Sequence, residues 1–543
     1  MVAVPRFRAF LRRESEATGL PLAWILGGAA LIHLAVTFLS VNPWHADEHF
    51  QVLEFAWARA GLAPLADLPW EWDARIRPTL QPVLAMGVLG ALRAVGVESP
   101  FVWIALLRVG TLALAFATLL RVFAVVGPSL EREGRRALWL SGLLLWFTPL
   151  LLFRFTSENL AGMALAWALT LVAAGRQPGD AAAEGTPGGA PARPAPDVLA
   201  GVLLGLAFVF RFQTAFAAAA ILAWMAVRGD GGRAVARMVG GAAVVVAVGT
   251  AVDAWFYGTW LLTPLNYVRV NVMEGVASTF GTSPWYGYGV GAPMAMAPPL
   301  GLVVAILVVA ALVGFPASPW SWAFLAFFLG HSVVPHKELR FLFPLLYLLP
   351  VLVGRGVHLV AGAAGGIGGW RRGVAWLLAV QNVTLLALVV GPTFRHGREM
   401  DGHFALWLWK EAGTGDGPVY VLDEGGDPYL VYGNPANVVR HPRVVGVAHQ
   451  PGDPIPRQVP AGTPPERLLL VTRGDAPPSV AGATVGDTAY RSEPGHRILA
   501  RSLGMPGAAW LPWLDRVTGW TDDPEQRTVF RVRRDGQREG RAP

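Results

Sequence analysis

The stretch PLAWILGGAALIHLAVTFLSV (Pro21–Val41) is followed, after three residues, by HADEHFQVLEFAW (His45–Trp57). The first stretch is apolar and long enough to cross the hydrocarbon core of a bilayer, which takes about 20 residues. The second places three carboxylates and two histidines where that span leaves the membrane. Ionisable side chains are costly beside hydrocarbon, so their clustering at a membrane exit predicts a functional site.

The composition is that of a membrane protein with many spans. Of the 543 residues, 53% are hydrophobic and 15% are charged, and the mean hydropathy is +0.44. Further apolar runs of spanning length occur up to residue 392. The formal charge of +7 lies mostly in short loops between these runs, which fits the positive-inside rule better than nucleic-acid binding. The chain has no cysteine, which excludes disulfides and thiolate metal sites.

The arginine-rich short loops also predict the topology. If they are cytoplasmic, every segment that carries acidic or aromatic motifs lies on the other face: 42–78, 154–158, 255–291 and 336–340. This arrangement requires that the 79–97 run does not cross, and that 198–227 forms two short helices broken near Arg211. Residues 1–392 then form an all-α polytopic domain with roughly eleven crossings, and the C-terminus is extracytoplasmic.

From residue 393 onward the character of the chain changes. Charged residues, proline and glycine become frequent, and short β-like runs appear at Pro418–Glu424, Arg467–Gly474 and Arg527–Arg534. We expect residues 393–543 to form a small mixed α/β extramembrane domain. This region carries no phosphate loop, metal-ligand spacing or nucleophile motif, so a structural or substrate-shaping role is expected.

The acidic segment suits general-base chemistry. A group transfer to a hydroxyl needs a carboxylate that accepts the hydroxyl proton, and Asp47 or Glu48 could do so. On an α-helix starting here, His45, Glu48 and His49 share one face, whereas Asp47 and Glu54 share another; His45 and Glu54 are candidate substrate-binding residues. Two other interpretations remain: a capped interfacial helix, and a His/Asp/Glu site for a divalent metal, which the chemistry permits but does not require.

A second cluster, HKELRF (His336–Phe341), is basic. At helical spacing, His336, Lys337 and Arg340 could converge on one anion. Arginine offers a planar fork to phosphate oxygens and lysine a point charge. Arg211 would be an intramembrane charge and would need an anion or a carboxylate beside it. The alternative is an ordinary interfacial anchor of snorkelling side chains.

The segment between the two clusters, 253–289, is rich in aromatic residues, asparagine and glycine. Asn266, Tyr267 and Asn271 are candidate carbohydrate ligands, because aromatic faces and amides together suit sugars, although an interfacial aromatic belt would look similar. Glu158, on another external turn, is a further candidate for substrate binding.

These motifs, in this order, resemble those of glycosyltransferase family 22, which contains the GPI-anchor and N-glycan lipid-linked mannosyltransferases. The resemblance rests on HADEHFQVLEFAW, on DAWFYGTWLLTPLNYVRVN (Asp253–Asn271) and on HKELRF, and it covers roughly residues 20–360. It implies a GT-C fold, an inverting mechanism, a sugar donor carried on polyprenyl or dolichyl phosphate, and a catalytic role for Asp47 and Glu48. Arg77-Pro78-Thr79 stands where the family usually has Arg-Ser-Tyr.

The predicted function is therefore transfer of mannose from such a donor to a glycan or glycolipid hydroxyl on the extracytoplasmic face. Mannose and the lipid-phosphate donor are implied by the resemblance. A transporter or flippase of a lipid-linked sugar is the alternative, but such proteins typically show internal repeats, and none is evident here. The abundance of alanine, glycine, proline and arginine indicates a high-GC bacterium. We therefore expect a bacterial inner (cytoplasmic) membrane with a periplasmic site, or the endoplasmic reticulum if the source is eukaryotic.

Overall fold

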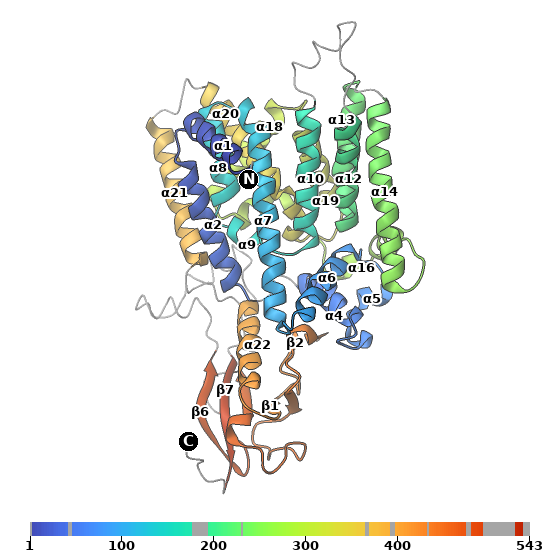
Figure 1. Cartoon of the computed structure of the whole chain (residues 1–543). Helices are drawn as coiled ribbons and strands as arrows, with labels where there is room; N and C mark the ends of the chain where they lie inside the picture. Colours follow the sequence, from blue (N-terminus) through green and yellow to red (C-terminus); the bar gives the residue numbers. More distant parts are fainter. Residues whose placement is uncertain are drawn as a thin grey trace. The chain divides into compact units, whose positions relative to one another are not determined.

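The chain folds as two compact units (Figure 1). The computed structural model describes residues 3–41, 46–175, 194–229, 232–363, 369–390, 397–431, 434–473, 479–491 and 527–535. The first unit comprises Met1–Phe38, Trp70–Val88 and Ala105–Ala387, and the second comprises Leu39–Pro69, Leu89–Ile104 and Leu388–Pro543. The second unit thus joins the acidic segment to the C-terminal region, a grouping that the sequence does not indicate.

The membrane part is helical. Its longer helices are α1 (Ala3–Thr18), α2 (Leu22–Leu39), α6 (Leu80–Ala94), α7 (Pro100–Val126), α8 (Arg132–Leu144), α10 (Ser157–Ala174), α12 (Pro194–Phe210), α13 (Ala215–Val227), α14 (Gly232–Tyr257), α18 (Leu300–Gly314), α19 (Pro319–Val333), α20 (Leu349–Ala363) and α21 (Gly369–Val390). Shorter helical pieces are α5 (Trp70–Ala74), α9 (Thr148–Leu151), η4 (Phe212–Thr214), α15 (Thr263–Val268), η5 (Arg269–Met273), α16 (Val276–Thr279), α17 (Gly287–Ala295) and η6 (Leu339–Tyr347).

Several of these helices can span a bilayer. Among the described residues, four helices, α2, α7, α10 and α14, are long and apolar enough to do so, and η6 with α20, bent by 67°, would make a fifth span. Other apolar helices, such as α13 and α18, are shorter. The predicted multi-span helical membrane protein is confirmed, whereas the count of roughly eleven crossings stays a prediction.

The predicted break in the 198–227 run is confirmed, whereas the prediction that the 79–97 run does not cross the membrane stays a prediction. The 198–227 run is broken: α12 ends at Phe210, Arg211 is extended, and α13 begins at Ala215 after the short turn η4. The 79–97 run yields α6, whose 15 residues reach roughly 22 Å, less than the ~30 Å hydrocarbon core.

Glycines allow the closest helix contacts. Where α12 meets α14, a Cβ on Gly201 would lie 2.0 Å from the carbonyl oxygen of Met238, and one on Gly241 would lie 2.5 Å from that of Val198. Small residues that let backbones approach are characteristic of helix packing in membranes, where apolar burial alone gives little association energy. Glycine is therefore required at this contact, because a Cβ atom would overlap the backbone of the neighbouring helix.

The C-terminal region contains a five-stranded mixed sheet. Its strands are β1 (Val419–Asp423), β4 (Val444–Ala448), β5 (Leu468–Arg473), β6 (Ala483–Arg491) and β7 (Arg527–Arg534), in the order β4-β1-β5-β7-β6. β4, β1 and β5 are parallel, and β7 and β6 are added antiparallel. The predicted mixed α/β domain is confirmed, and its three predicted strands are β1, β5 and β7. β2 (Leu430–Val431) and β3 (Asn434–Pro435) form a separate small hairpin.

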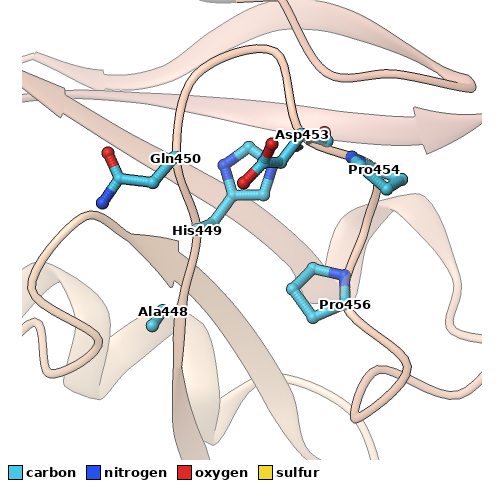
Figure 2. A pocket seen from close by; sticks show the side chains of 6 residues that line it. All are labelled: Ala448, His449, Gln450, Asp453, Pro454 and Pro456. Atoms are coloured by element: carbon cyan, nitrogen blue, oxygen red, sulfur yellow. Dashed lines mark hydrogen bonds between the residues drawn. The ribbon is translucent and has the colours of Figure 1, made fainter.

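A surface hollow of about 430 Å³ lies beside the loop that follows β4, and Figure 2 shows the six residues that line it. His449, its buried member, closes this loop. Its backbone N–H donates to the Asp423 carbonyl, at the end of β1, over 3.0 Å, and its Nε2 lies 3.1 Å from the Asp453 carbonyl oxygen. Because both contacts are made to the backbone, we assign His449 a structural role.

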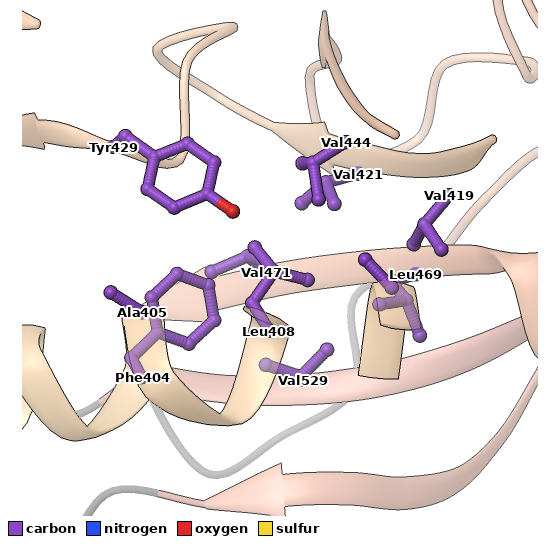
Figure 3. Packing of buried hydrophobic residues seen from close by; sticks show 11 residues of the cluster. Phe404, Ala405, Leu408, Val419, Val421, Tyr429, Val444, Leu469, Val471 and Val529 are labelled. Carbon is purple, nitrogen blue, oxygen red and sulfur yellow. The ribbon is translucent and has the colours of Figure 1, made fainter. Parts of the chain in front are cut away.

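Both faces of the parallel strands are covered, as such strands require. On one face, α22 (Gly397–Gly413) packs Phe404 and Leu408 against side chains from four strands, β1, β4, β5 and β7, as Figure 3 shows. The strand residues of this cluster are Val419, Val421, Val444, Leu469, Val471 and Val529. The intervening residues, including Leu422 and Leu470, face the opposite cluster, as the two-residue period of a strand dictates. This explains why the β-like runs of β1 and β5 are almost continuously apolar.

We predict that Gly241→Ala destabilises the protein by about 1–3 kcal/mol, because the new methyl group would overlap the backbone of α12. Thermal unfolding in detergent should show a lower Tm. Gly240→Ala is the matched control, since a Cβ on Gly240 meets no atom within 4 Å. Equal Tm values for the two variants would contradict the proposed close contact.

Candidate active site

The acidic segment forms an irregular helix in the second unit. A short α-helical turn, α3 (Ala46–Glu48), widens into the π-helix η1 (His49–Glu54) before α4 (Phe55–Arg59). The prediction of an α-helix with Asp47 and Glu54 on one face is therefore wrong. The wider turn pairs residues five apart, and His49 Nε2 lies 2.8 Å from Glu54 Oε1.

The carboxylates of this segment differ in accessibility. Asp47 is half-buried, whereas Glu48 is 4% and Glu54 1% exposed. Glu54 Oε1 also accepts the backbone N–H of Val438 over 2.9 Å. Of the two candidate bases, Asp47 is thus the more accessible to an acceptor, and Glu54 is committed to protein partners on one oxygen. His45 lies outside the described residues.

The basic cluster lies in the first unit and is organised by Glu338. Arg340 Nε lies 2.5 Å from Glu338 Oε2, and His336 Nε2 lies 3.0 Å from Glu338 Oε1. Residues 334–338 are not helical, and the 3-10 turn η6 begins only at Leu339. The predicted helical spacing of His336 and Arg340 is therefore wrong, yet the two side chains still converge because they share one carboxylate.

Glu158 brings two arginines together. Arg211 Nη1 lies 2.9 Å and Arg340 Nη1 lies 3.6 Å from Glu158 Oε1. Both guanidinium carbons also lie 5.0 Å from the ring centroid of Phe341. The three charged side chains are between 5% and 11% exposed. The prediction that Arg211 meets a carboxylate is confirmed, and Arg211 Nε has no hydrogen-bond partner among the described residues.

Local structure explains this convergence. Thr156 is the N-cap of α10, and its hydroxyl accepts the N–H of Asn159. Glu158 therefore lies in the first turn of α10, where the helix dipole favours a negative charge. Arg211 lies in the extended break between α12 and η4, so its side chain leaves the helix axis at the level of Glu158. The broken span thus delivers a buried cation to a capped helix end.

Lys337 is held partly by carbonyl groups. Its ammonium donates to the Ser283 carbonyl over 3.1 Å and to the Val334 carbonyl over 2.5 Å, and it lies 6.0 Å from the centroid of the Tyr288 ring. Since an ammonium has three protons, one stays available to a ligand. Desolvation lowers the pKa of Lys337 from its usual value.

The 253–289 segment is anchored to the same cluster. Ser283 N–H donates to the Pro335 carbonyl over 2.9 Å, and His336 Nδ1 lies 2.9 Å from the Gly281 carbonyl oxygen. Both partners of the His336 ring, the Gly281 carbonyl and the Glu338 carboxylate, are hydrogen-bond acceptors. The two arginines of this cluster, Arg211 and Arg340, thus face two carboxylates, Glu158 and Glu338.

The predicted sugar ligands lie at the other end of that segment. The hydroxyl of Tyr267 is hydrogen-bonded by the amide of Gln213, in the turn that follows Arg211. Asn266 and Asn271 are half-buried, and Asn271 Nδ2 has no hydrogen-bond partner in the described part of the chain. Gln213 was not among the predicted residues, although it lies in the same FRFQTAF motif as Arg211.

The Arg77-Pro78-Thr79 segment, which departs from the family pattern, is hydrogen-bonded to α14. The N–H and the hydroxyl of Thr79 donate to Asp253 Oδ1 over 2.8 and 2.7 Å, and Tyr257 donates to the Arg77 carbonyl over 2.8 Å. Asp253 and Tyr257 of the aromatic motif thus hold the start of α6. Within the described ranges, no group of three histidine or carboxylate side chains could hold a metal ion.

Comparison with known proteins decides the family. The profile of the Alg9-like mannosyltransferase family matches residues 24–389. The chain belongs to this family. The matched region of the Alg9-like chain includes both the acidic segment and the basic cluster, and it ends before the C-terminal sheet. The resemblance to family 22 is thereby confirmed.

Relatives of this Alg9-like chain include two mammalian proteins named GPI alpha-1,2-mannosyltransferase 3. The Bos taurus protein is 22% identical over 379 residues, which cover 66% of this chain and 62% of the relative. The human protein is 22% identical over 408 residues, covering 71% and 65%. The Schizosaccharomyces pombe probable Dol-P-Man:Man(7)GlcNAc(2)-PP-Dol alpha-1,6-mannosyltransferase is 33% identical over 115 residues, covering 21% and 20%. The chain thus spans less than two thirds of the length of these relatives.

Solved structures with similar chain traces include ArnT from Cupriavidus metallidurans bound to undecaprenyl phosphate, with a TM-score of 0.44 and 13% identity over 94% of this chain and 98% of that one. Another is the oligosaccharyltransferase AglB from Archaeoglobus fulgidus, with a TM-score of 0.37 and 11% identity over 74% and 62%.

We predict that Glu158→Gln lowers the Tm, because it leaves the buried Arg211 without its counterion, a change that typically costs about 3–5 kcal/mol. A short-chain polyprenyl phosphate should raise the Tm of this variant more than that of the wild type, since its phosphate can replace the lost carboxylate. Glu274→Gln, which breaks an exposed pair with Arg269, should leave the Tm nearly unchanged. No added stabilisation of the Glu158 variant would contradict a phosphate site at the arginines.

Proposed function

We propose that this protein is an inverting GT-C mannosyltransferase. It would move mannose from a polyprenyl or dolichyl phosphate to a hydroxyl of a glycan or glycolipid on the extracytoplasmic face. The observation that carries the proposal is the buried convergence of Arg211 and Arg340 on Glu158, in a chain of the Alg9-like family. Family membership favours sugar transfer over the alternative of a lipid-linked sugar transporter.

The donor phosphate would bind at the basic cluster. Arg211 and Arg340 present charged N–H groups in a site that is mostly shielded from water, where such donors stabilise an anion strongly. The remaining ammonium proton of Lys337 would complete the set, and His336 would join it when a phosphate oxygen replaces Glu338 at its Nε2. Because a dianionic lipid phosphate departs during transfer, these cations would stabilise the charge that develops on it.

The acidic segment would supply the base. Asp47 would take the proton of the acceptor hydroxyl as its oxygen attacks the anomeric carbon of mannose. The bond between that carbon and the phosphate oxygen breaks, and the lipid phosphate leaves with the bonding electrons. Attack from the opposite face inverts the configuration. The partial exposure of Asp47, compared with the burial of Glu48, supports this assignment.

The remaining candidates would shape the sugar sites. Tyr267, Asn266 and Asn271 would contact carbohydrate, and the Asn271 amide nitrogen, which has no partner among the described residues, supports such a role. His45 is proposed to bind substrate on its position in the acidic segment alone. Glu158 would act as the resting counterion of the arginines and contact substrate when the donor is bound.

The source and location are also proposals. The composition supports a bacterial source, and hence an inner membrane with the site on the periplasmic side. The acceptor would then be a bacterial glycan or glycolipid, while the relatives support mannose as the transferred sugar.

We predict that Asp47→Asn lowers kcat by ~10²–10⁴-fold, because the amide cannot accept the hydroxyl proton, with a donor KM close to that of the wild type. Transfer of radiolabelled mannose from a synthetic polyprenyl-phosphate mannose to a lipid extract of the source cells would measure it. Glu48→Gln is the neighbouring control. Wild-type turnover by Asp47→Asn together with an inactive Glu48→Gln would exchange the two roles, and full activity of both would refute the mechanism.

We also predict an extracytoplasmic C-terminus, because the arginine-rich loops are expected to be cytoplasmic. Alkaline phosphatase is active only outside the cytoplasm, so it should be active when it is fused to the C-terminus. Activity of a cytoplasmic reporter such as green fluorescent protein at the same position would overturn the topology.

A further inference from the structure

Glu54 joins two segments of the second unit that lie far apart in sequence. Its Oε1 atom lies 2.8 Å from His49 Nε2, within the acidic segment, and accepts the backbone N–H of Val438, 384 residues later, over 2.9 Å. The side chains of His49 and Glu54 are 6% and 2% exposed. Val438 is fully buried in η8 (Asn437–Val439), a short turn of the C-terminal region.

The π-helix makes this three-way contact possible. In an α-helix, neighbours on one face are three or four residues apart. The wider turn of η1 instead aligns His49 with Glu54, five residues on, so that one carboxylate oxygen serves both the imidazole and an incoming backbone donor. Helical segments of this kind are rare and occur frequently at functional sites.

A second contact holds the same two segments together. The side-chain amide of Asn437 donates to Asp67 Oδ2 over 3.0 Å. Two consecutive residues of η8, Asn437 and Val438, thus bind Asp67 and Glu54 of the 46–69 segment. Glu54 contacts the backbone N–H of Val438, a group that every residue except proline carries. The family match, moreover, ends at residue 389, before this region. The C-terminal region therefore makes a contribution to the acidic segment that no sequence motif reveals.

The buried carboxylate is costly to keep. Glu54 Oε2 has no hydrogen-bond partner among the described residues. An ionised group that is only partly satisfied pays a desolvation penalty, and an apolar side chain could fill the same space without it. Packing alone gives no reason for a glutamate here, whereas holding a neighbouring turn in one orientation does.

We propose that Glu54 and His49 are positioning residues, through which the C-terminal domain fixes the orientation of the turn that carries Asp47. The inference rests on the proposed role of Asp47 as the base. Asp47 precedes His49 by two residues, and α3 runs directly into η1. A turn held at His49 therefore also holds the Asp47 carboxylate, and a displacement of about 1 Å in such a group can cost on the order of 10²-fold in rate.

Two substitutions separate positioning from direct proton transfer. Glu54→Ala removes both contacts and should lower kcat by about 10²-fold with an unchanged donor KM. Glu54→Gln keeps an oxygen that can accept from His49 and Val438, so it should restore kcat to within about threefold of the wild type. The assay uses the full-length protein and polyprenyl-phosphate mannose. Glu411→Gln, which breaks the Arg531 ion pair in the same domain, is the control and should not change kcat.

Hydrogen–deuterium exchange of the same proteins provides a readout that needs no turnover. Glu54→Ala should increase exchange in residues 46–60 and 434–440 together, and Glu54→Gln should not. Normal exchange or normal kcat in Glu54→Ala would overturn the proposal, as would a loss of activity in Glu54→Gln equal to that in Glu54→Ala. If the wild type transferred no mannose, the proposed function would fail, and the exchange data would still decide whether Glu54 orders the turn.

Discussion

The membrane unit depends on one buried ion pair, that between Arg211 and Glu158. A guanidinium with 6% exposure is tolerated in a membrane protein only if an opposite charge compensates it. This requirement explains why the 198–227 run is broken at Arg211, since the extended residue directs the side chain toward the first turn of α10. Arg340, farther along the chain, also forms an ion pair with Glu158, and Phe341 lies against both guanidinium groups.

The same arrangement gives the basic cluster its chemical character. Glu158 and Glu338 neutralise most of the charge of the arginines, so the cations are held in place without needing a ligand to order them. When a lipid phosphate binds, its oxygens would replace carboxylate oxygens as the partners of arginine N–H groups that stay in place. Fixed donors require little reorganisation when charge develops, which is the physical basis of electrostatic catalysis.

The acidic segment is organised by a different principle. It lies in the second unit with the C-terminal domain, and its ordering depends on main-chain donors and on a π-helical turn. The domain itself is an ordinary mixed sheet with a helix on one face, and the short turn η8 belongs to the same region. The C-terminal region thus has a physical link to the candidate base, although it lies outside the matched family region.

The sequence by itself determined the multi-span helical character of the chain, the broken helix at Arg211 and the strands β1, β5 and β7, because each follows from local apolar patterning or from the cost of a buried charge. It also identified both charged clusters, since ionisable residues stand out beside apolar runs. It missed β4 and β6, whose glycines interrupt the β pattern. Only the tertiary structure decided the long-range pairings: Glu158 with two arginines, and Glu54 with Val438. These depend on distances between remote segments and on backbone N–H groups, which are the same in every residue and leave no trace in the sequence.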